Sequence, residues 1–91
     1  MRALYITILR GVTSDVIHNL TDWEPIKHDL YYCKKDNCYI TLVSSVRDMS
    51  GKFADRIYID MTFSSLPFKE HQRFIKKFSG LGLVPIMVGG Y

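Results

Sequence analysis

The stretch ADRIYIDMTF, residues 54–63, decides the fold that this sequence predicts. Apolar and polar side chains alternate along it, which is the period of a β-strand with one face against a core. The side chains expected to face the core are Ile57, Ile59, Met61 and Phe63. Those expected on the other face are Arg56, Tyr58, Asp60 and Thr62. A half-buried strand of this kind needs neighbours, and the flanking sequence supplies them.

Two further strands are expected before this one. Residues 30–34 and 38–46 are rich in aromatic and β-branched side chains, and a short polar turn at 35–37 separates them. Ser50-Gly51 offers a second turn, which leads into the quoted strand. The three segments together predict an antiparallel meander.

The ends of the chain add two strands. Residues 3–9 are apolar on both faces, a pattern typical of a strand in the middle of a sheet. Residues 83–88 form a last, short strand, and residues 21–28 are expected as a loop. A short helix over 13–19 is expected to follow the first strand.

A second helix is expected to begin at Ser64 or Ser65 and to end at Gly80 and Gly82. Its apolar side chains recur at helical spacing and predict a buried stripe. This inner stripe consists of Phe68, His71, Ile75 and Phe78. The outer stripe, a basic patch, consists of Lys69, Arg73, Lys76 and Lys77. Such a patch can bind phosphate groups, and it can also serve only to keep the helix surface hydrated.

This order of elements predicts one α+β domain over residues 1–91. The expected architecture is a mainly antiparallel sheet of about five strands with two helices packed on one face. It corresponds to a ferredoxin-like (split βαβ) arrangement in which the strand at 30–34 is an extra edge strand. The first strand lies inside the sheet in this arrangement, in agreement with its two apolar faces.

Hairpin geometry predicts which residues face one another across the meander. The expected pairs are Cys33–Cys38, Tyr32–Tyr39, Leu42–Ile59 and Val43–Tyr58. Since both helices cover one face, the other face is expected to be open. The binding residues predicted on this open face are Tyr32, Lys34, Tyr39, Arg56 and Tyr58, with Tyr5 and Thr7 beside them.

Exposed tyrosines and cations on an open sheet fit more than one function. The leading hypothesis is a small non-catalytic binding or regulatory protein, inhibitor-like or adaptor-like, of the kind that phages and mobile elements encode. It would dock on a protein partner, because tyrosine is enriched at binding hot spots, and a homodimer is an allied possibility. The alternative is a single-stranded RNA- or DNA-binding module that stacks bases on the same tyrosines. A third interpretation is a merely solvated face, because tyrosine and threonine are good strand formers.

Nothing in the sequence indicates an enzyme. The motifs GxSxG, HExxH, CxxC and GxxxxGK are missing, so no catalytic residue is assigned. Neither a cofactor nor a metal ion is expected. A small metal-dependent nuclease or hydrolase is the third functional hypothesis, with Asp60, Glu70 or His71 at its centre. It requires a second acidic ligand that the sequence pattern does not place.

The charge and the cysteines bear on partner and compartment. The net charge of +3 tolerates an anionic partner without requiring one. No uncharged stretch reaches the roughly 20 apolar residues that span a bilayer, so no membrane partner is expected. A secreted domain of this size would normally need more disulfide cross-links than two cysteines can form. The expected location is therefore the cytoplasm, or the host cytoplasm if a virus encodes the chain. Cys33 and Cys38 are expected to be free thiols packed in the sheet. The alternatives are a cross-strand disulfide in an oxidising compartment and two metal ligands with His28 or His71 nearby.

Overall fold

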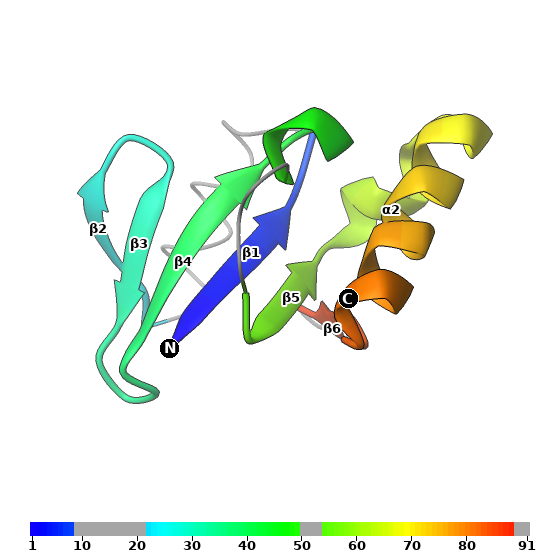
Figure 1. Cartoon of the computed structure of the whole chain (residues 1–91). Helices are drawn as coiled ribbons and strands as arrows, with labels where there is room; N and C mark the ends of the chain where they lie inside the picture. Colours follow the sequence, from blue (N-terminus) through cyan, green and yellow to red (C-terminus); the bar gives the residue numbers. More distant parts are fainter. Residues whose placement is uncertain (9–21, 50–53, 89–91) are drawn as a thin grey trace.

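The computed structural model describes residues 1–8, 22–49 and 54–88 of the chain. Within these ranges six strands form one sheet, and α2 lies against one of its faces (Figure 1). The strands are β1 (Arg2–Ile6), β2 (Glu24–Lys27), β3 (Leu30–Cys33), β4 (Cys38–Val43), β5 (Arg56–Ile59) and β6 (Ile86–Met87). The helical elements are η1 (Val46–Met49), η2 (Met61–Ser65) and α2 (Phe68–Leu81). The helix expected over 13–19 lies outside the described residues.

The sheet is mixed, and β1 lies at its centre. The strand order is β2-β3-β4-β1-β5-β6. β2, β3 and β4 form an antiparallel unit, whereas β1 runs parallel to both β4 and β5, and β6 runs parallel to β5. The central place of β1 is confirmed. Its physical reason is burial on both faces, because Leu4 and Ile6 face α2 while Ala3 and Tyr5 face the other side.

The predicted ferredoxin-like antiparallel topology is wrong. It rested on a hairpin at Ser50-Gly51 between the second and third meander strands, and those two residues lie outside the described part of the chain. In the structure β4 and β5 are not neighbours, because β1 is inserted between them. η1 follows β4 and buries Met49 on the α2 side, and β5 runs parallel to β4.

Several element bounds also differ from the expected ones. β2 falls in a segment expected as a loop, and it pairs antiparallel with β3 at the sheet edge. β5 ends at Ile59 because the Asp60 carboxylate accepts a hydrogen bond from the Thr62 N–H and caps η2. The expected strand over 83–88 is reduced to β6. The register of β3 and β4 is confirmed, with Cys33 opposite Cys38 and Tyr32 opposite Tyr39.

A separate core lies on each face of the sheet. The helix-side core consists of Leu4, Ile6, Val43, Met49, Ile57, Phe63, Phe74 and Phe78. The opposite core consists of Ala3, Tyr5, Tyr31, Cys33, Cys38, Ile40, Leu42, Tyr58 and Val88. Trp23 packs against the opposite core, with its ring centroid 5.7 Å from that of Tyr5 and 5.0 Å from that of Tyr58. The face expected to be open therefore carries a buried aromatic cluster.

The position of α2 follows from its two ends and from its buried stripe. Pro67 holds Leu66 in an extended conformation, which delays the helix to Phe68. Gly82 ends it with a left-handed φ of 70°, as the glycine there suggests. The inner residues are Phe74 and Phe78, whereas the expected inner residue Phe68 is 78% exposed.

Ile75, the other expected inner residue, is 40% exposed because it lies about 100° around the helix from Phe74. His71 is half-buried, and its ring packs against Phe63. Within residues 1–8, 22–49 and 54–88, no helix has the length and apolar character needed to cross a membrane.

Candidate functional site

The three predicted binding tyrosines do not share a face. Tyr32 and Tyr39 form a pair with ring centroids 4.8 Å apart, and Tyr39 is 49% exposed. Tyr58 points to the opposite side and is buried beside Trp23. The cause is the insertion of β1, because Tyr58 aligns with Tyr5 and through it with Leu42 rather than with Val43. An offset of one residue moves every side chain of a strand to the other face.

Of the two cations predicted on this face, Arg56 is separated from the tyrosine pair, because it lies on the same side of β5 as Tyr58. Arg56 Nη1 donates a hydrogen bond of 3.2 Å to the Tyr58 hydroxyl and lies 3.4 Å from Asp36 Oδ2. The bond to Tyr58, followed by the nearby charge of Asp36, raises the pKa of the Arg56 guanidinium. Arg56 therefore forms its ion pair with Asp36, in the turn between β3 and β4. Lys34 is exposed in the turn between β3 and β4.

The residues of the nuclease hypothesis each have a different structural partner. Asp60 accepts hydrogen bonds from the Tyr5 hydroxyl at 2.9 Å and from the Thr62 hydroxyl. Glu70 Oε1 accepts a 3.2 Å bond from the backbone N–H of Val46, while His71 lies against Phe63. Among the residues that the structure describes, no three His, Cys, Asp or Glu side chains are placed to hold a metal ion.

The cysteines are buried, free and directly opposite one another on β3 and β4. This confirms the expectation of free thiols in the sheet. Burial raises the pKa of the Cys38 thiol, and the positive charge of Arg56 only partly offsets that effect. Cys33 Sγ lies 3.7 Å from Asp36 Oδ2, to which it can donate a weak hydrogen bond.

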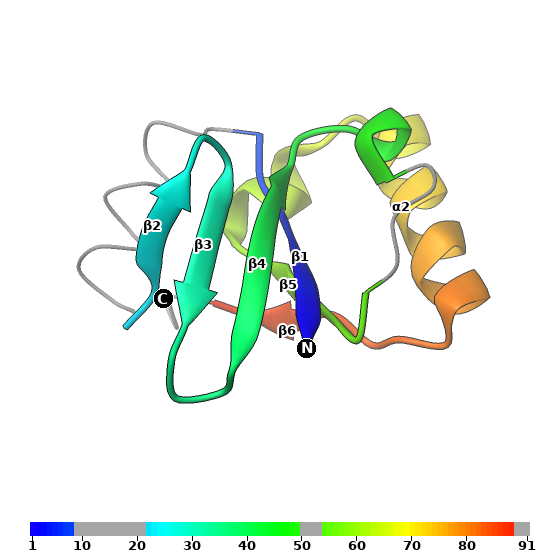
Figure 2. The same ribbon diagram turned by 60° about the vertical axis from the view of Figure 1, so that its left-hand side comes forward.

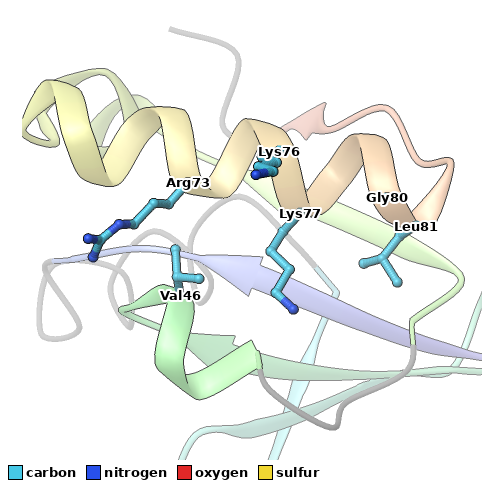
Figure 3. A pocket seen from close by; sticks show the side chains of 6 residues that line it. All are labelled: Val46, Arg73, Lys76, Lys77, Gly80 and Leu81. Carbon is cyan, nitrogen blue, oxygen red and sulfur yellow. The ribbon is translucent and has the colours of Figure 1, made fainter.

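A basic pocket between α2 and η1 is the site that the structure does assemble (Figure 3). Its volume is about 500 Å³. The described residues that line it are Val46, Arg73, Lys76, Lys77, Gly80 and Leu81. In Figure 3 the side chain of Lys77 extends from the helix toward the side on which η1 lies, Val46 points from η1 toward the helix, and Arg73 extends toward the N-terminal end of the helix. The pocket therefore combines a cationic rim with an apolar interior.

The rotation of α2 explains why these cations gather on one side. Phe74 and Phe78 are fixed in the helix-side core, and at about 100° per residue the positions 73, 77 and 80 fall on one flank of the helix. η1 lies along this flank, held there by the Val46–Glu70 hydrogen bond. Figure 2 shows α2 and η1 at one end of the molecule and the β2–β3 hairpin at the other.

The electrostatic balance of the pocket is positive. Arg73, Lys76 and Lys77 are exposed, and none of the described lining residues carries a negative charge. Beside the pocket, the carboxylate of Glu70 pairs with one of these cations: its Oε2 lies 3.9 Å from Arg73 Nη1. Among the described residues, the ion pair of Glu70 is with Arg73 and not with either lysine, and its other oxygen accepts the hydrogen bond from Val46.

Sequence reasoning identified the cations of this site but not its walls. The helical period placed Arg73, Lys76 and Lys77 on an outer stripe, and the structure shows them exposed. Val46 was expected within a strand, and Gly80 as a helix terminator. Gly80 lies inside α2, where a Cβ would meet no atom within 4 Å. No local signal links Val46 to the helix.

Comparison of this chain with protein-family models, with curated proteins and with solved structures finds no match.

Proposed function

We propose that this protein is a small non-catalytic binding protein that binds single-stranded nucleic acid along the basic flank of α2. One observation carries the proposal: Arg73, Lys76 and Lys77 surround one pocket of about 500 Å³ on a chain of net charge +3. Lysine and arginine are the side chains that neutralise backbone phosphates, and such contacts supply most of the affinity of non-specific binding.

The rest of the chain is compatible with this function. The free, buried cysteines fit a reducing compartment, so the cytoplasm is the proposed location. Lys69 lies on the same exposed side of α2 and extends the basic surface beyond the pocket. The buried tyrosines of the opposite core take no part in this proposal.

Fluorescence anisotropy with a short labelled single strand, titrated at several salt concentrations, tests the proposal. Each neutralised phosphate contributes a slope of about −0.7 in log K against log salt. The pocket cations should therefore give a slope of about −1.4 if only the two lysines contact phosphates and of about −2 if Arg73 does so as well. Neutralising Lys76 and Lys77 together to Gln should weaken binding and flatten the slope.

The matched control is the double change of Lys34 and Lys35 to Gln. Both residues are exposed in the turn between β3 and β4, far from α2, so the control removes the same charge elsewhere. If the two double variants lose affinity equally, only the net charge matters and the proposed site is wrong.

Protein docking at β6 is the second candidate function, and one observation favours it. Val84, Ile86 and Met87 are 82%, 46% and 56% exposed, and in the described residues β6 pairs only with β5. The other edge strand, β2, is protected against pairing by Pro25 and by its charged residues. The apolar edge at β6 can accept a further strand.

A second copy of this chain is the partner that we propose for β6. No charged residue lies between positions 81 and 88, so two positively charged copies can meet here without opposing charges. Sedimentation velocity should then show a dimer that Ile86→Lys dissociates. A wild-type chain that stays monomeric at the highest accessible concentration would exclude self-pairing.

A further inference from the structure

We infer that the pocket between α2 and η1 takes the base of one nucleotide, with the adjoining phosphates on Lys76 and Lys77. This inference rests on the proposed function and adds a ligand chemistry to it: a phosphate-bearing unit with a planar, largely apolar ring. A free nucleotide and one residue of a single strand share that chemistry.

The size and lining of the pocket carry the first step. A volume of about 500 Å³ is in the range of sites that enclose small molecules, and it exceeds what a phosphate alone requires. Val46 and Leu81 supply apolar walls, while Gly80 leaves the space beside the helix free of side-chain atoms. Bare phosphate binding would use the cations and leave this apolar space without an occupant.

Arg73 carries the second step. Its guanidinium is planar, and such planes stack on exposed bases where aromatic rings are missing. None of the described lining residues is aromatic, so Arg73 is the described lining residue that can stack on a base in this pocket. Glu70 Oε2 lies 3.9 Å from Arg73 Nη1, on the same flank of α2, and this ion pair restricts the orientation of the guanidinium. Arg73 itself is 69% exposed and accessible to a ligand.

The third step concerns the state of the nucleic acid. Bases in a duplex are stacked and paired, so a pocket on one helix flank cannot enclose one without opening the duplex. A single strand presents its bases freely. An acidic peptide could bind the same cations, but its carboxylates would make no contact with the apolar walls of the pocket. The geometry therefore favours a single-stranded nucleotide unit.

The test compares a short single strand with an abasic strand of the same length and charge. Because a stacked base is worth about 1–3 kcal/mol, the base-containing strand should bind about tenfold more tightly. Gly80→Leu fills the pocket and keeps every cation, so it should remove this difference while the salt slope stays unchanged. Arg73→Lys keeps the charge without the plane and should reduce the difference.

Ser79→Leu is the matched control, since it adds the same side chain to an exposed neighbouring position that does not line the pocket. It should preserve the preference for bases. Thermal unfolding followed by circular dichroism verifies that the three variants fold. Adenosine monophosphate and a short poly-glutamate serve as competitors and distinguish the sources of the ligand.

Each outcome decides a different point. Equal binding of the base-containing and abasic strands overturns the nucleotide pocket and leaves the proposed function intact. Binding of neither strand overturns both. Competition by poly-glutamate as strong as that by the base-containing strand also overturns the inference and assigns the pocket to acidic peptides. Competition by the mononucleotide at the affinity of the strand supports the pocket and identifies a free nucleotide as its ligand.

Discussion

Tyr5, on the central strand, donates a hydrogen bond of 2.9 Å from its hydroxyl to Oδ2 of Asp60, the residue that follows β5. Both side chains are buried, and the same carboxylate caps η2 through the Thr62 N–H. Tyr5→Phe should therefore lower the free energy of unfolding by about 1–3 kcal/mol, because a buried carboxylate loses a donor. Urea denaturation followed by circular dichroism measures the change.

Tyr32→Phe is the control for this prediction. The Tyr32 hydroxyl also donates a bond of 2.9 Å, to Asn37 Oδ1, but at an exposed site where water replaces the partner. The expected cost is below about 0.5 kcal/mol. Equal effects of the two changes would contradict a structural role of the Tyr5–Asp60 bond.

The buried stripe of α2 can be tested at Phe74. This side chain is 0% exposed, and its ring lies 6.0 Å from Phe63 and 6.1 Å from Phe78. Phe74→Ala should cost about 3–5 kcal/mol, since it removes apolar contacts and leaves a cavity. In guanidinium chloride titrations, Phe68→Ala should change stability by no more than about 0.5 kcal/mol. A larger loss of stability in Phe68→Ala would show that Phe68 belongs to the buried stripe of the helix after all.

Two glycines near the end of α2 should respond in opposite directions to alanine. Gly80 is helical, and an added Cβ meets nothing within 4 Å, so Gly80→Ala should stabilise the protein by about 1 kcal/mol. Gly82 has a φ of 70°, where a Cβ is strained, so Gly82→Ala should destabilise it by about 1–2 kcal/mol. Midpoints of urea unfolding compare the pair, and a shift of the same sign in both would refute the assigned helix end.

The Cys38 thiol should be slow to react in the folded protein. Burial raises its pKa, so the reactive thiolate forms at higher pH in the folded chain than in the unfolded one. The protonated Cys38 thiol contributes fully to the free energy of unfolding at pH values below the ordinary thiol pKa. This contribution is lost as the pH rises toward the raised pKa of Cys38 in the folded chain.

Alkylation rates of a Cys33→Ser variant, measured against pH, follow Cys38 alone. In native buffer the rate should increase at a higher pH than in urea. Identical pH profiles in the two solvents would show that Cys38 is not protected by the fold.

Local patterns predicted some pairings of the sheet correctly. The β3–β4 register follows from a short turn, with the Asn37 N–H donating to the Lys34 carbonyl, and such a turn determines the pairing on its own. The β4–β5 relationship could not be predicted in this way. A strand with two apolar faces can be inserted between two segments that also look like a hairpin, and only long-range packing decides between the two arrangements.

The candidate site shows the same division between local and distant signals. Arg73 and Lys77 repeat along one helix, so their shared flank was predictable from the helical period. The wall at Val46 depends on a crossover between β4 and β5 that the sequence did not indicate. The expectation that Tyr32, Tyr39 and Tyr58 share one face is wrong because β1, and not β4, is the neighbour of β5, which places Tyr58 on the other side of the sheet.

The position of β1 between β4 and β5 also has a consequence for the order of folding. β1 is synthesised well before either neighbour, so the nascent chain carries an apolar strand with two unpaired edges until residues 38–43 emerge, and with one unpaired edge until residues 56–59 emerge. The β3–β4 hairpin can close early, whereas the parallel pairings need distant segments and form slowly. Aggregation during synthesis should therefore depend on how quickly β1 is enclosed, and slow translation after β4 should lengthen the period in which it is exposed.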